Sequence, residues 1–584
     1  MIGRFPILDI SPVVEFGGEL IGVKAIAGEQ ITVTATVIRE GHDELQADVL
    51  LFDPSGKEKN RVAMREIWPG SARFTADITP TSVGLWSYAI EAYDDQDKKR
   101  NRDARRLSTL STQYPINVEC DRALIGSWYE FFPRSEGAIK NKDGSLTSGT
   151  FKTAIASLNR VAEMGFDVLY LPPIHPIGIA FRKGKNNYLE ALPSDPGVPW
   201  GIGGAAGGHD AINPELGTLD DFRAFVEAAK KLKIEIALDL ALQTSPDHPW
   251  VQTNPEWFTT RPDGTIAYAE NPPKKYQDIY PINFDNDYPG IRAEVIRILK
   301  FWIDKGIRIY RVDNPHTKPV HFWQDVIAEI NREFPDVVFL AEAFTKPAMM
   351  HALGKAGFQQ SYTYFTWRTT KNELTEYGRE VAEQTSAFFR PNFWVNTPDI
   401  LPFHLQSGNP AVFALRAVLA STMTPSWGMY AGYELYEHQP FKEGGEEYLD
   451  SEKYEIKVRD WEKANKAGLT LAPFISVLNR IRREHVALQR LRNLVFHHSE
   501  SDQVIAYSKR EGKDLILVVV NLDPTRAQES TVHWNMEALG LADGTFEVTD
   551  LLDCAHYSWS AHTYVKLDPA RPVGRVAHIA HVKL

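Results

Sequence analysis

The chain has 584 residues, so about two to four domains are expected. Its hydrophobic content of 43% and charged content of 24% are typical of a soluble globular protein, and its net charge of -12 argues against nucleic-acid binding, which depends on basic surface. No apolar run reaches the roughly 20 residues that a membrane span needs, and the N-terminus shows no signal-peptide pattern. We therefore expect a cytoplasmic protein with neither nucleic-acid nor membrane partners.

Residues 1–118 are predicted to form a β-sandwich. The segment Ile31–Val37 alternates apolar and polar residues, which is the period of a half-buried strand, and Val83–Tyr93 is a similar run. Pro, Gly and Asp residues separate these segments, as turns between short strands require. A dense run of charged residues follows at Asp94–Arg106, and we interpret it as a solvated linker rather than a binding patch.

Helical and strand patterns alternate from Leu124 onwards. In Phe151–Met164 apolar residues recur on one helical stripe, and Gly165 ends this helix before an apolar strand at Phe166–Leu171. Alternating elements at short intervals predict a parallel sheet, and their number favours a closed (β/α)8 barrel over residues 119–490. The further elements that we predict are a helix capped by Thr218, strands at Ile234–Leu240, Ile307–Val312 and Val337–Ala341, and helices at Ile291–Lys305 and Val320–Glu333.

Two regions lie outside this repeat. The stretch of about residues 243–288, after the third strand, is rich in Pro, Asn, Asp and aromatic residues and too long for an ordinary loop, so it is predicted to be a functional insertion. Strand-like runs return in residues 491–584, at Val504–Tyr507, Leu515–Val520 and Phe546–Val548, and predict a C-terminal β-sandwich. The expected fold is therefore multidomain, α/β plus all-β: a TIM barrel flanked by two β-sandwiches.

Three acids mark the candidate active site. Asp313 follows the predicted strand Ile307–Val312, and Glu342 and Asp399 each follow another short apolar run. All three are therefore expected at the C-terminal ends of successive barrel strands, where such barrels place their active sites. Arg311 lies two positions before Asp313, so strand alternation points both side chains to the same side. A guanidinium beside a carboxylate keeps that carboxylate ionised, as a nucleophile requires.

The acids and their flanking motifs resemble the ordered regions of the α-amylase superfamily. The same pattern includes Asp239 in Ala-Leu-Asp-Leu-Ala-Leu-Gln and the opening Gly-Phe-Asp-Val-Leu-Tyr-Leu-Pro-Pro. The resemblance covers nearly the whole chain and is greatest to one subfamily, the bacterial maltosyltransferases that use α-maltose 1-phosphate to lengthen α-1,4-glucan. The motifs that are similar to this subfamily are Gly-Gly-His-Asp-Ala-Ile-Asn-Pro-Glu-Leu-Gly-Thr, Asn-Pro-Pro-Lys-Lys-Tyr-Gln-Asp-Ile-Tyr-Pro, Arg-Val-Asp-Asn-Pro-His-Thr-Lys-Pro, Tyr-Phe-Thr-Trp-Arg-Thr-Thr and Asn-Thr-Pro-Asp-Ile-Leu.

This resemblance implies transfer of a maltosyl unit from α-maltose 1-phosphate to the non-reducing end of an α-1,4-glucan, with retention of configuration and release of phosphate. Retention takes a nucleophilic carboxylate and a protonated carboxyl about 5–5.5 Å apart. We assign Asp313 as the nucleophile and Glu342 as the acid/base. Asp399 is expected to bind sugar hydroxyls and to stabilise the transition state, and Arg311 is expected to orient Asp313.

A phosphate leaving group needs cationic and amide donors around it. The donors drawn from the loop motifs are Lys183, Lys274 and Tyr276. The resemblance adds Gln243 and Asn314 to this phosphate pocket, and it assigns the second glucose to Asn187, Lys453 and Tyr454. The subfamily uses no metal or other cofactor for catalysis, and the sequence shows no metal-ligand cluster.

Three departures from the expected patterns bear on function. Asp399 follows Thr397 and Pro398 where amylases place a His, and the first region continues to Gln243 where amylases have Asn-His. Those histidines hold the sugar in hydrolases, so their absence argues against a plain amylase. The subfamily also carries a helical insertion associated with its dimer, and here only the short charged link around Asp94–Asp121 occupies that place. A homodimer therefore remains an expectation from the resemblance alone.

Each assignment has an alternative. The protein could be an amylase-like hydrolase, in which water attacks the same intermediate, or a non-catalytic glucan-binding scaffold. Strand-end carboxylates often serve as caps or ion-pair partners, and single lysines such as Lys183 and Lys274 usually lie on the surface. His316 is equally well explained as a structural histidine. Lys453 and Tyr454 lie in a charged stretch that also fits solvated surface.

Overall fold

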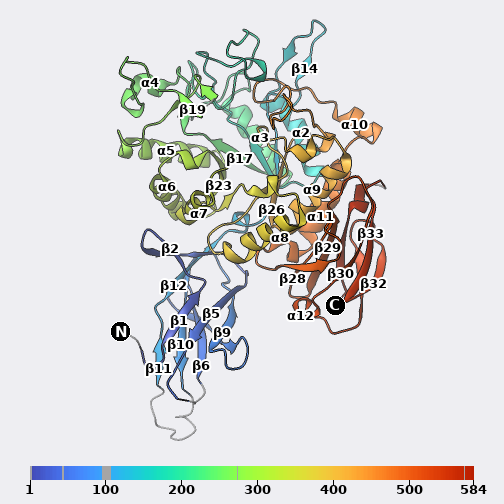
Figure 1. Ribbon diagram of the computed structural model, residues 1–584. Helices are drawn as coiled ribbons and strands as arrows, with labels where there is room; N and C mark the ends of the chain where they lie inside the picture. Colours follow the sequence, from blue (N-terminus) through green and yellow to red (C-terminus); the bar gives the residue numbers. More distant parts are fainter. Residues whose placement is uncertain (1–2, 42–44, 95–106, 272–273, 571–572, 584) are drawn as a thin grey trace.

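The protein is built from three bodies, which Figure 1 shows as a blue N-terminal sandwich, a central barrel and a red C-terminal sandwich. The computed structural model describes residues 3–41, 45–94, 107–271, 274–570 and 573–583. Among these residues no helix combines the length and the apolar character that crossing a membrane requires. The fold confirms the expected combination of a barrel with flanking β-sandwiches.

The N-terminal sandwich packs two sheets around their own apolar core. One sheet has the order β1-β5-β9-β8 and the other β4-β12-β10-β6-β7, with β11 paired to β10. The predicted strand Ile31–Val37 is β5, whose burial alternates residue by residue. The other strands are β1 (Ile7–Ser11), β4 (Val23–Ile26), β6 (Gln46–Phe52), β7 (Glu58–Ala63), β8 (Arg65–Glu66), β9 (Arg73–Ile78), β10 (Gly84–Tyr93), β11 (Ser108–Leu110) and β12 (Tyr114–Glu119).

The link predicted at Asp94–Asp121 is shorter than expected. Its second half forms β11 and β12, which belong to the N-terminal sandwich because both pair with β10. Residues 95–106 lie outside the described residues. Lys24 of this sandwich donates to the backbone carbonyl of Phe358, and its N–H donates to the carbonyl of Ala387, so the sandwich is joined to the barrel by direct hydrogen bonds.

Eight parallel strands form the barrel in the described part of the chain. Neighbouring strands follow one another in sequence, and β26 returns to pair with β13, as a closed barrel requires. A parallel bridge between Ser361 and Pro391 joins β24 to the start of β25 and completes the ring. The strands are β13 (Gly126–Glu130), β16 (Val168–Leu171), β17 (Glu235–Leu240), β22 (Ile309–Asp313), β23 (Val338–Glu342), β24 (Gln360–Ser361), β25 (Phe393–Trp394) and β26 (Ser426–Tyr430).

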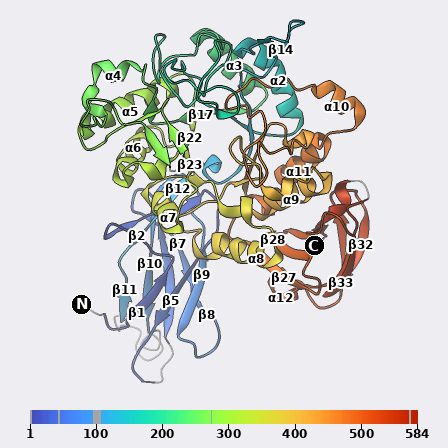
Figure 2. The ribbon, with the colours of Figure 1, turned by 45° about the horizontal axis from the view of Figure 1, so that its top comes forward.

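Amphipathic helices cover the outside of the barrel (Figure 2). Thr150 and Thr218 each close a capping box at a helix N-terminus, which fixes where α2 and α3 begin. α9 is instead apolar on every side, because it lies between the barrel and the C-terminal sandwich. The helices are α2 (Phe151–Glu163), α3 (Leu219–Lys231), α5 (Tyr288–Ile303), α6 (Val320–Glu333), α7 (Pro347–Ala356), α8 (Lys371–Arg379), α9 (Pro410–Met423), α10 (Trp461–Ala467) and α11 (Ala472–Glu484).

The C-terminal sandwich is one folded sheet of order β32-β31-β34-β29-β28-β27-β30-β33. Alternate residues of β29 face two cores: Leu517 and Val519 point into the sandwich, whereas Ile516 and Val518 pack with the barrel. This alternation explains why β29 is apolar throughout. The elements are β27 (Leu494–Ser499), β28 (Val504–Glu511), β29 (Asp514–Asn521), β30 (Gln528–His533), α12 (Met536–Leu539), β31 (Thr545–Asp550), β32 (His556–Ser560), β33 (His562–Leu567) and β34 (Ala577–Val582).

The stretch after the third barrel strand lies at the end of the barrel that faces away from the N-terminal sandwich, where α4 and β19 are seen in Figure 1. It consists of short elements only, and two small hairpins hold it together through the pairs β18–β21 and β19–β20. The C-terminal ends of the barrel strands lie at this same end. The elements are β18 (Gln243–Thr244), α4 (Pro249–Thr253), β19 (Ala269–Asn271), β20 (Lys274–Tyr276) and β21 (Tyr280–Pro281).

Candidate active site

A cavity of about 710 Å³ opens at this end of the barrel. Most residues predicted for the site line it, although they come from distant parts of the sequence: Lys183, Asn187, Gln243, Tyr276, Asp313, Asn314, Glu342, Asp399, Lys453 and Tyr454. Arg311 lies beneath the acids. Lys274 belongs to β20, next to the lining residue Tyr276, but its side chain lies outside the part of the chain that the structure describes.

Arg311 is the centre of the buried charges. Its Nη1 lies 2.9 Å from Asp313 Oδ1 and 2.8 Å from Asp239 Oδ2, and its Nη2 lies 3.1 Å from Glu342 Oε1. Burial alone lowers the pKa of Arg311, but Glu342 and the other acids outweigh burial and raise it well above the ordinary value. The guanidinium is therefore permanently charged, and it joins acids from three neighbouring strands.

Asp313 and Glu342 occupy equivalent positions on adjacent strands. Each is the last residue of its strand, and the two are paired in the register of β22 and β23. Neighbouring strands lie about 4.8 Å apart, so the two carboxyl groups flank the same small space. Both side chains line the cavity at this end of the barrel.

The surroundings of Glu342 favour its protonated form. Burial, strengthened by the charges of Asp313 and Asp399, raises the pKa of Glu342 to about 8, although Arg311 opposes this rise. The carboxyl group of Glu342 is therefore protonated at neutral pH and is ready to donate a proton. Asp313 shares Arg311 but lies beside the amide of Asn314, whose Nδ2 is 3.4 Å from Asp313 Oδ2.

The turn after Asp313 is held in an unusual shape. Asn314 has φ 42° and ψ 54°, a left-handed conformation that Asn tolerates better than most residues. Its N–H donates to Glu342 Oε2 at 3.2 Å, so this backbone bridges the two acids. Lys318 Nζ donates to the carbonyl oxygens of Asp313 and Asn314 at 3.3 and 3.2 Å and closes the turn. Lys318 was not predicted, although it lies in the motif that contains Asp313.

Asp399 is not at the end of a strand, so that part of the prediction is wrong. It lies beyond β25 in a turn closed by backbone hydrogen bonds between Thr397 and Ile400, and β24 separates its strand from that of Glu342. The apolar run before it is a strand of two residues that ends at Trp394. The loop still carries Asp399 to the cavity, where it forms an ion pair with Lys453.

Burial decides whether Lys183, Lys453 and Tyr454 lie on the solvated surface or in the cavity. Lys183 is 2% exposed although it lies on a loop, and it lines the cavity close to Asp278, so it is not a surface lysine. Tyr454 is 7% exposed, and Lys453 lies against its ring and against Asp399, which excludes the solvated-surface reading. His316 also lines the cavity, and its buried Nδ1 has no hydrogen-bond partner among the residues that the structure describes.

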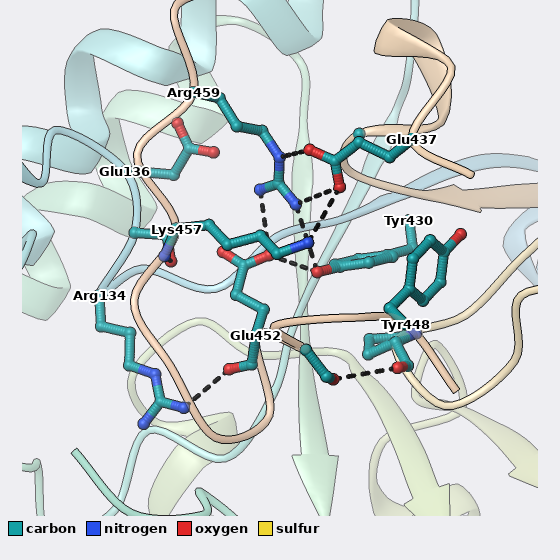
Figure 3. A network of polar contacts seen from close by, with 12 residues as sticks. Arg134, Glu136, Tyr430, Glu437, Tyr448, Glu452, Lys457 and Arg459 are labelled. Carbon is teal, nitrogen blue, oxygen red and sulfur yellow. Dashed lines mark hydrogen bonds and ion pairs between the residues drawn. The ribbon is translucent and has the colours of Figure 1, made fainter. Parts of the chain in front are cut away.

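A buried polar network holds the loop that carries Lys453 (Figure 3). Arg134 donates to the carbonyl oxygens of Glu452 and Lys453 at 2.8 and 3.0 Å. The Glu452 carboxylate accepts hydrogen bonds from the Tyr430 hydroxyl and, at 3.0 Å, from Arg459 Nη1. These contacts fix the backbone on either side of Lys453. Sequence reasoning missed this network, because its members are spread over the chain.

A chain of neutral histidines supports the turn before Gln243. The N–H of Trp250 donates to His248 Nδ1 at 3.0 Å, so the proton of His248 is on Nε2, which lies 3.1 Å from His209 Nδ1. His209 Nε2 then donates to the carbonyl oxygen of Ala241 at 2.8 Å. Burial lowers the pKa of His209 to about 4 and that of His248 to about 2. Both imidazoles are therefore neutral, so each donates one hydrogen bond and accepts another along the chain.

Glycines make room for this chain. A Cβ atom on Gly203 would lie 2.2 Å from the His248 ring, and one on Gly208 would lie 2.3 Å from His248 Nε2. Side chains at either position would therefore displace the imidazole. The Ala241 carbonyl also accepts from the N–H of Gln243 at 3.0 Å, so the chain ends at a residue of the cavity wall.

The fold and the site define the class of protein. It is an eight-stranded (β/α)8 barrel with an arginine between two acids at the C-terminal ends of its strands, where such barrels place their active sites. The fold is similar to that of a cyclomaltodextrinase, with a TM-score of 0.62 and 16% identity over 96% of this chain and 98% of that chain. It is also similar to the α-amylase from Geobacillus thermoleovorans, with a TM-score of 0.61 and 17% identity over 79% and 98%.

Comparison of sequences identifies the family. Residues 3–119 match the family model for domain N/S of α-1,4-glucan:maltose-1-phosphate maltosyltransferase, and residues 496–582 match the model described as GLGE, C-terminal. The chain is 51% identical to the α-1,4-glucan:maltose-1-phosphate maltosyltransferase 2 of Streptomyces coelicolor, over 99% of this chain and 96% of the relative. It is 43% identical to the Mycobacterium tuberculosis enzyme over 99% and 96%. The chain belongs to the α-1,4-glucan:maltose-1-phosphate maltosyltransferase family.

The alignments also reveal a difference in length. They extend over 651 and 678 positions, whereas this chain has 584 residues. The relatives therefore contain segments that this chain lacks.

Proposed function

We propose that the protein transfers a maltosyl unit from α-maltose 1-phosphate to the non-reducing end of an α-1,4-glucan and releases phosphate. Membership of the maltosyltransferase family supports this activity. The observation that carries the proposed mechanism is the pair of strand-end acids, Asp313 and Glu342, held by Arg311 at the base of the cavity.

In the first half-reaction Asp313 attacks the anomeric carbon. Arg311 engages Oδ1, and among the described residues Oδ2 is contacted by the Asn314 amide at 3.4 Å, so Oδ2 is the attacking oxygen in this proposal. The new C–O bond forms on the face opposite the phosphate, and the bond to phosphate breaks with its electron pair. The proton of Glu342 passes to the departing phosphate oxygen. The product is a maltosyl ester of Asp313 with inverted configuration.

Cationic and amide groups on one side of the cavity form the proposed phosphate pocket. Lys183 contributes a buried positive charge, and Gln243, Tyr276 and Asn314 contribute neutral donors around the same space. The sequence motif assigns Lys274 to the same pocket as a second cation. Its neighbour Tyr276 lines the cavity, which supports the assignment. Charge-assisted hydrogen bonds from these groups stabilise the phosphate as it leaves.

In the second half-reaction the 4-hydroxyl of the glucan end attacks the ester. Glu342, now ionised, takes the hydroxyl proton, and the electron pair of the C–O bond returns to Asp313. The second inversion restores the α configuration. Asp399 binds sugar hydroxyls in this proposal, and Lys453, Tyr454 and Asn187 hold the second glucose. The supporting observations are that all four line the cavity and that Lys453 pairs with Asp399.

Phosphate release from α-maltose 1-phosphate, with and without maltohexaose, tests this function. The proposal predicts acceptor-dependent release, and mass spectrometry of the products should show glucans that grow in steps of two hexoses. Free maltose formed at the same rate with and without acceptor would identify a hydrolase. The absence of any turnover would identify a glucan-binding scaffold.

The remaining parts of the proposal concern the setting of the enzyme. We propose a cytoplasmic homodimer that binds neither nucleic acid nor membrane. We place the boundaries between its three domains near residues 118 and 490. The net charge of -12 and two free cysteines, Cys120 and Cys554, support this setting. Light scattering coupled to size-exclusion chromatography measures the oligomeric state, and a monomeric mass contradicts the dimer.

A further inference from the structure

Three side chains that can ligate a metal ion meet between the barrel and the C-terminal sandwich. His485 directly follows α11, Asp514 is the first residue of β29, and His581 lies on β34. β29 and β34 are paired with Ile516 opposite His581. Because side chains alternate along a strand, Asp514 lies on the same face as Ile516 and His581. That face packs against the barrel, which supplies His485.

The ligand atoms converge on one carboxylate oxygen. His485 Nδ1 lies 2.8 Å from Asp514 Oδ1, and His581 Nε2 lies 3.5 Å from the same atom. All three atoms lie within 4.8 Å of one another. Among the described residues this is the only group of at least three His, Cys, Asp and Glu side chains with such a spacing.

This spacing and these atom types fit a transition-metal ion. Two ligands bound to Zn²⁺ at about 2.1 Å with a tetrahedral angle lie about 3.4 Å apart. The distances of 2.8 and 3.5 Å to Asp514 Oδ1 lie on either side of that value. Two imidazole nitrogens and a carboxylate oxygen suit Zn²⁺, Co²⁺ or Ni²⁺, whereas Mg²⁺ and Ca²⁺ favour oxygen ligands.

The surroundings orient the carboxylate and leave access for an ion. The N–H of Ala487 donates to Asp514 Oδ2 at 2.9 Å, so Oδ1 is turned towards the two imidazoles. The His485 and Asp514 side chains are 13% and 16% exposed and that of His581 is 36% exposed, so water can reach the site and supply a fourth ligand. None of the three residues lines the cavity of the active site.

We propose that His485, Asp514 and His581 form a binding site for a divalent transition-metal ion of the Zn²⁺ class. The bound ion joins the end of α11 to two strands of the C-terminal sandwich. It stabilises the contact between the two bodies and takes no part in maltosyl transfer. This site is independent of the proposed reaction.

The test uses the full-length protein, treated with a chelator, dialysed and titrated with Zn²⁺ and Co²⁺. Calorimetry should show one bound equivalent, Co²⁺ should add a visible absorption band, and the thermal midpoint should rise with the metal. His581→Gln removes one ligand, and Asp514→Asn removes the charged ligand but keeps an acceptor for the Ala487 N–H. We expect each variant to bind the metal about 100-fold more weakly.

A second imidazole pair provides the matched control. His533 and His562, on the outer face of the same sandwich, have Nδ1 atoms 2.8 Å apart. His562→Gln should therefore bind the metal as the wild type does. The proposal is overturned if the wild type binds no metal, or if His581→Gln retains full affinity. It is also overturned if only His562→Gln loses binding, because the metal is then on the outer surface.

Discussion

The two halves of the proposed active site are built differently. Asp313 and Glu342 end adjacent barrel strands, and Arg311 lies two residues before Asp313; the exposed fraction of the Arg311, Asp313 and Glu342 side chains is only 5%, 8% and 11%. Asp399 and Lys453 lie on loops instead, and the Asp399 side chain is 40% exposed. The groups that we propose make and break bonds are therefore fixed by the sheet, whereas the groups that we propose recognise the outer sugar depend on loops.

A site on loops needs its own support. The backbone around Lys453 is held by Arg134 and by the buried carboxylate of Glu452 (Figure 3). That carboxylate forms an ion pair with Arg459, whose Nη1 lies 3.0 Å from Glu452 Oε2. Such buried pairs add little net stability, because desolvation offsets their attraction, but they fix one geometry. We infer that changes in the strand half alter the chemical step, whereas changes in the loop half alter substrate affinity.

The largest effect is expected in the strand half. Asp313→Asn keeps the size of the side chain but removes the nucleophilic charge, so kcat for phosphate release should fall by at least about 10⁴-fold. The KM for α-maltose 1-phosphate should change little, because binding does not depend on this carboxylate alone. Steady-state kinetics with a phosphate assay measures both. Retention of more than about 1% of kcat would contradict the role of Asp313.

Glu342→Gln should have the next largest effect. Loss of the acid/base should lower kcat by about 10²–10⁴-fold. The pKa of Glu342 is raised to about 8, so its protonated form persists through neutral pH and is lost as the pH rises through 8. The wild-type rate of phosphate release should therefore decline above pH 8. The profile of Glu342→Gln should lack that decline, and a decline that persists in the variant would assign it to another group.

Lys453→Met tests the loop half. This variant keeps the apolar stem but removes the ion pair with Asp399, so KM for α-maltose 1-phosphate should rise about tenfold, or about 1.4 kcal/mol, while kcat stays within about threefold. Lys185→Met is the matched control, since Lys185 is paired with Glu455 at 3.1 Å but does not line the cavity. If Lys453→Met lowered kcat and left KM unchanged, the loop half would affect the chemical step, which contradicts the proposed difference between the two halves.

The smallest effect is expected for the histidine chain. His209→Phe keeps a ring but removes the hydrogen bond to the Ala241 carbonyl, so the turn before Gln243 should loosen. KM for the phosphate donor should rise about three- to tenfold, and KM for the glucan acceptor should not change. His175→Phe is the control, because His175 bonds to Ala211 instead. Equal changes in both KM values would show a general loss of structure.

Sequence periodicity predicted the long elements well. The predicted helix Val320–Glu333 and strand Ile31–Val37 coincide with α6 and β5. The strands β24 and β25, which have two residues each, were not identified from the sequence, because no period can be read from so short a segment. Their place in the barrel is set by pairing with β23 and β26, which is a tertiary effect.

The same distinction explains the results for the site. The contact between Arg311 and Asp313 follows from strand alternation and was predicted, and the structure places the two groups 2.9 Å apart. The pairing of Lys453 with Asp399 depends on how a long loop folds back, so composition alone left solvated surface as an alternative. The histidine chain was missed because its directional hydrogen bonds depend on tautomers that no sequence pattern records.

The most direct measurement is peptide mass spectrometry of Glu342→Gln incubated with α-maltose 1-phosphate and no acceptor. The second half-reaction is slowed in this variant, so the maltosyl ester should accumulate on the peptide that contains Asp313, as an added mass of two anhydrohexose units. The double variant with Asp313→Asn should show no adduct. An adduct on a different acid, or phosphate release without any adduct, would contradict a covalent mechanism through Asp313.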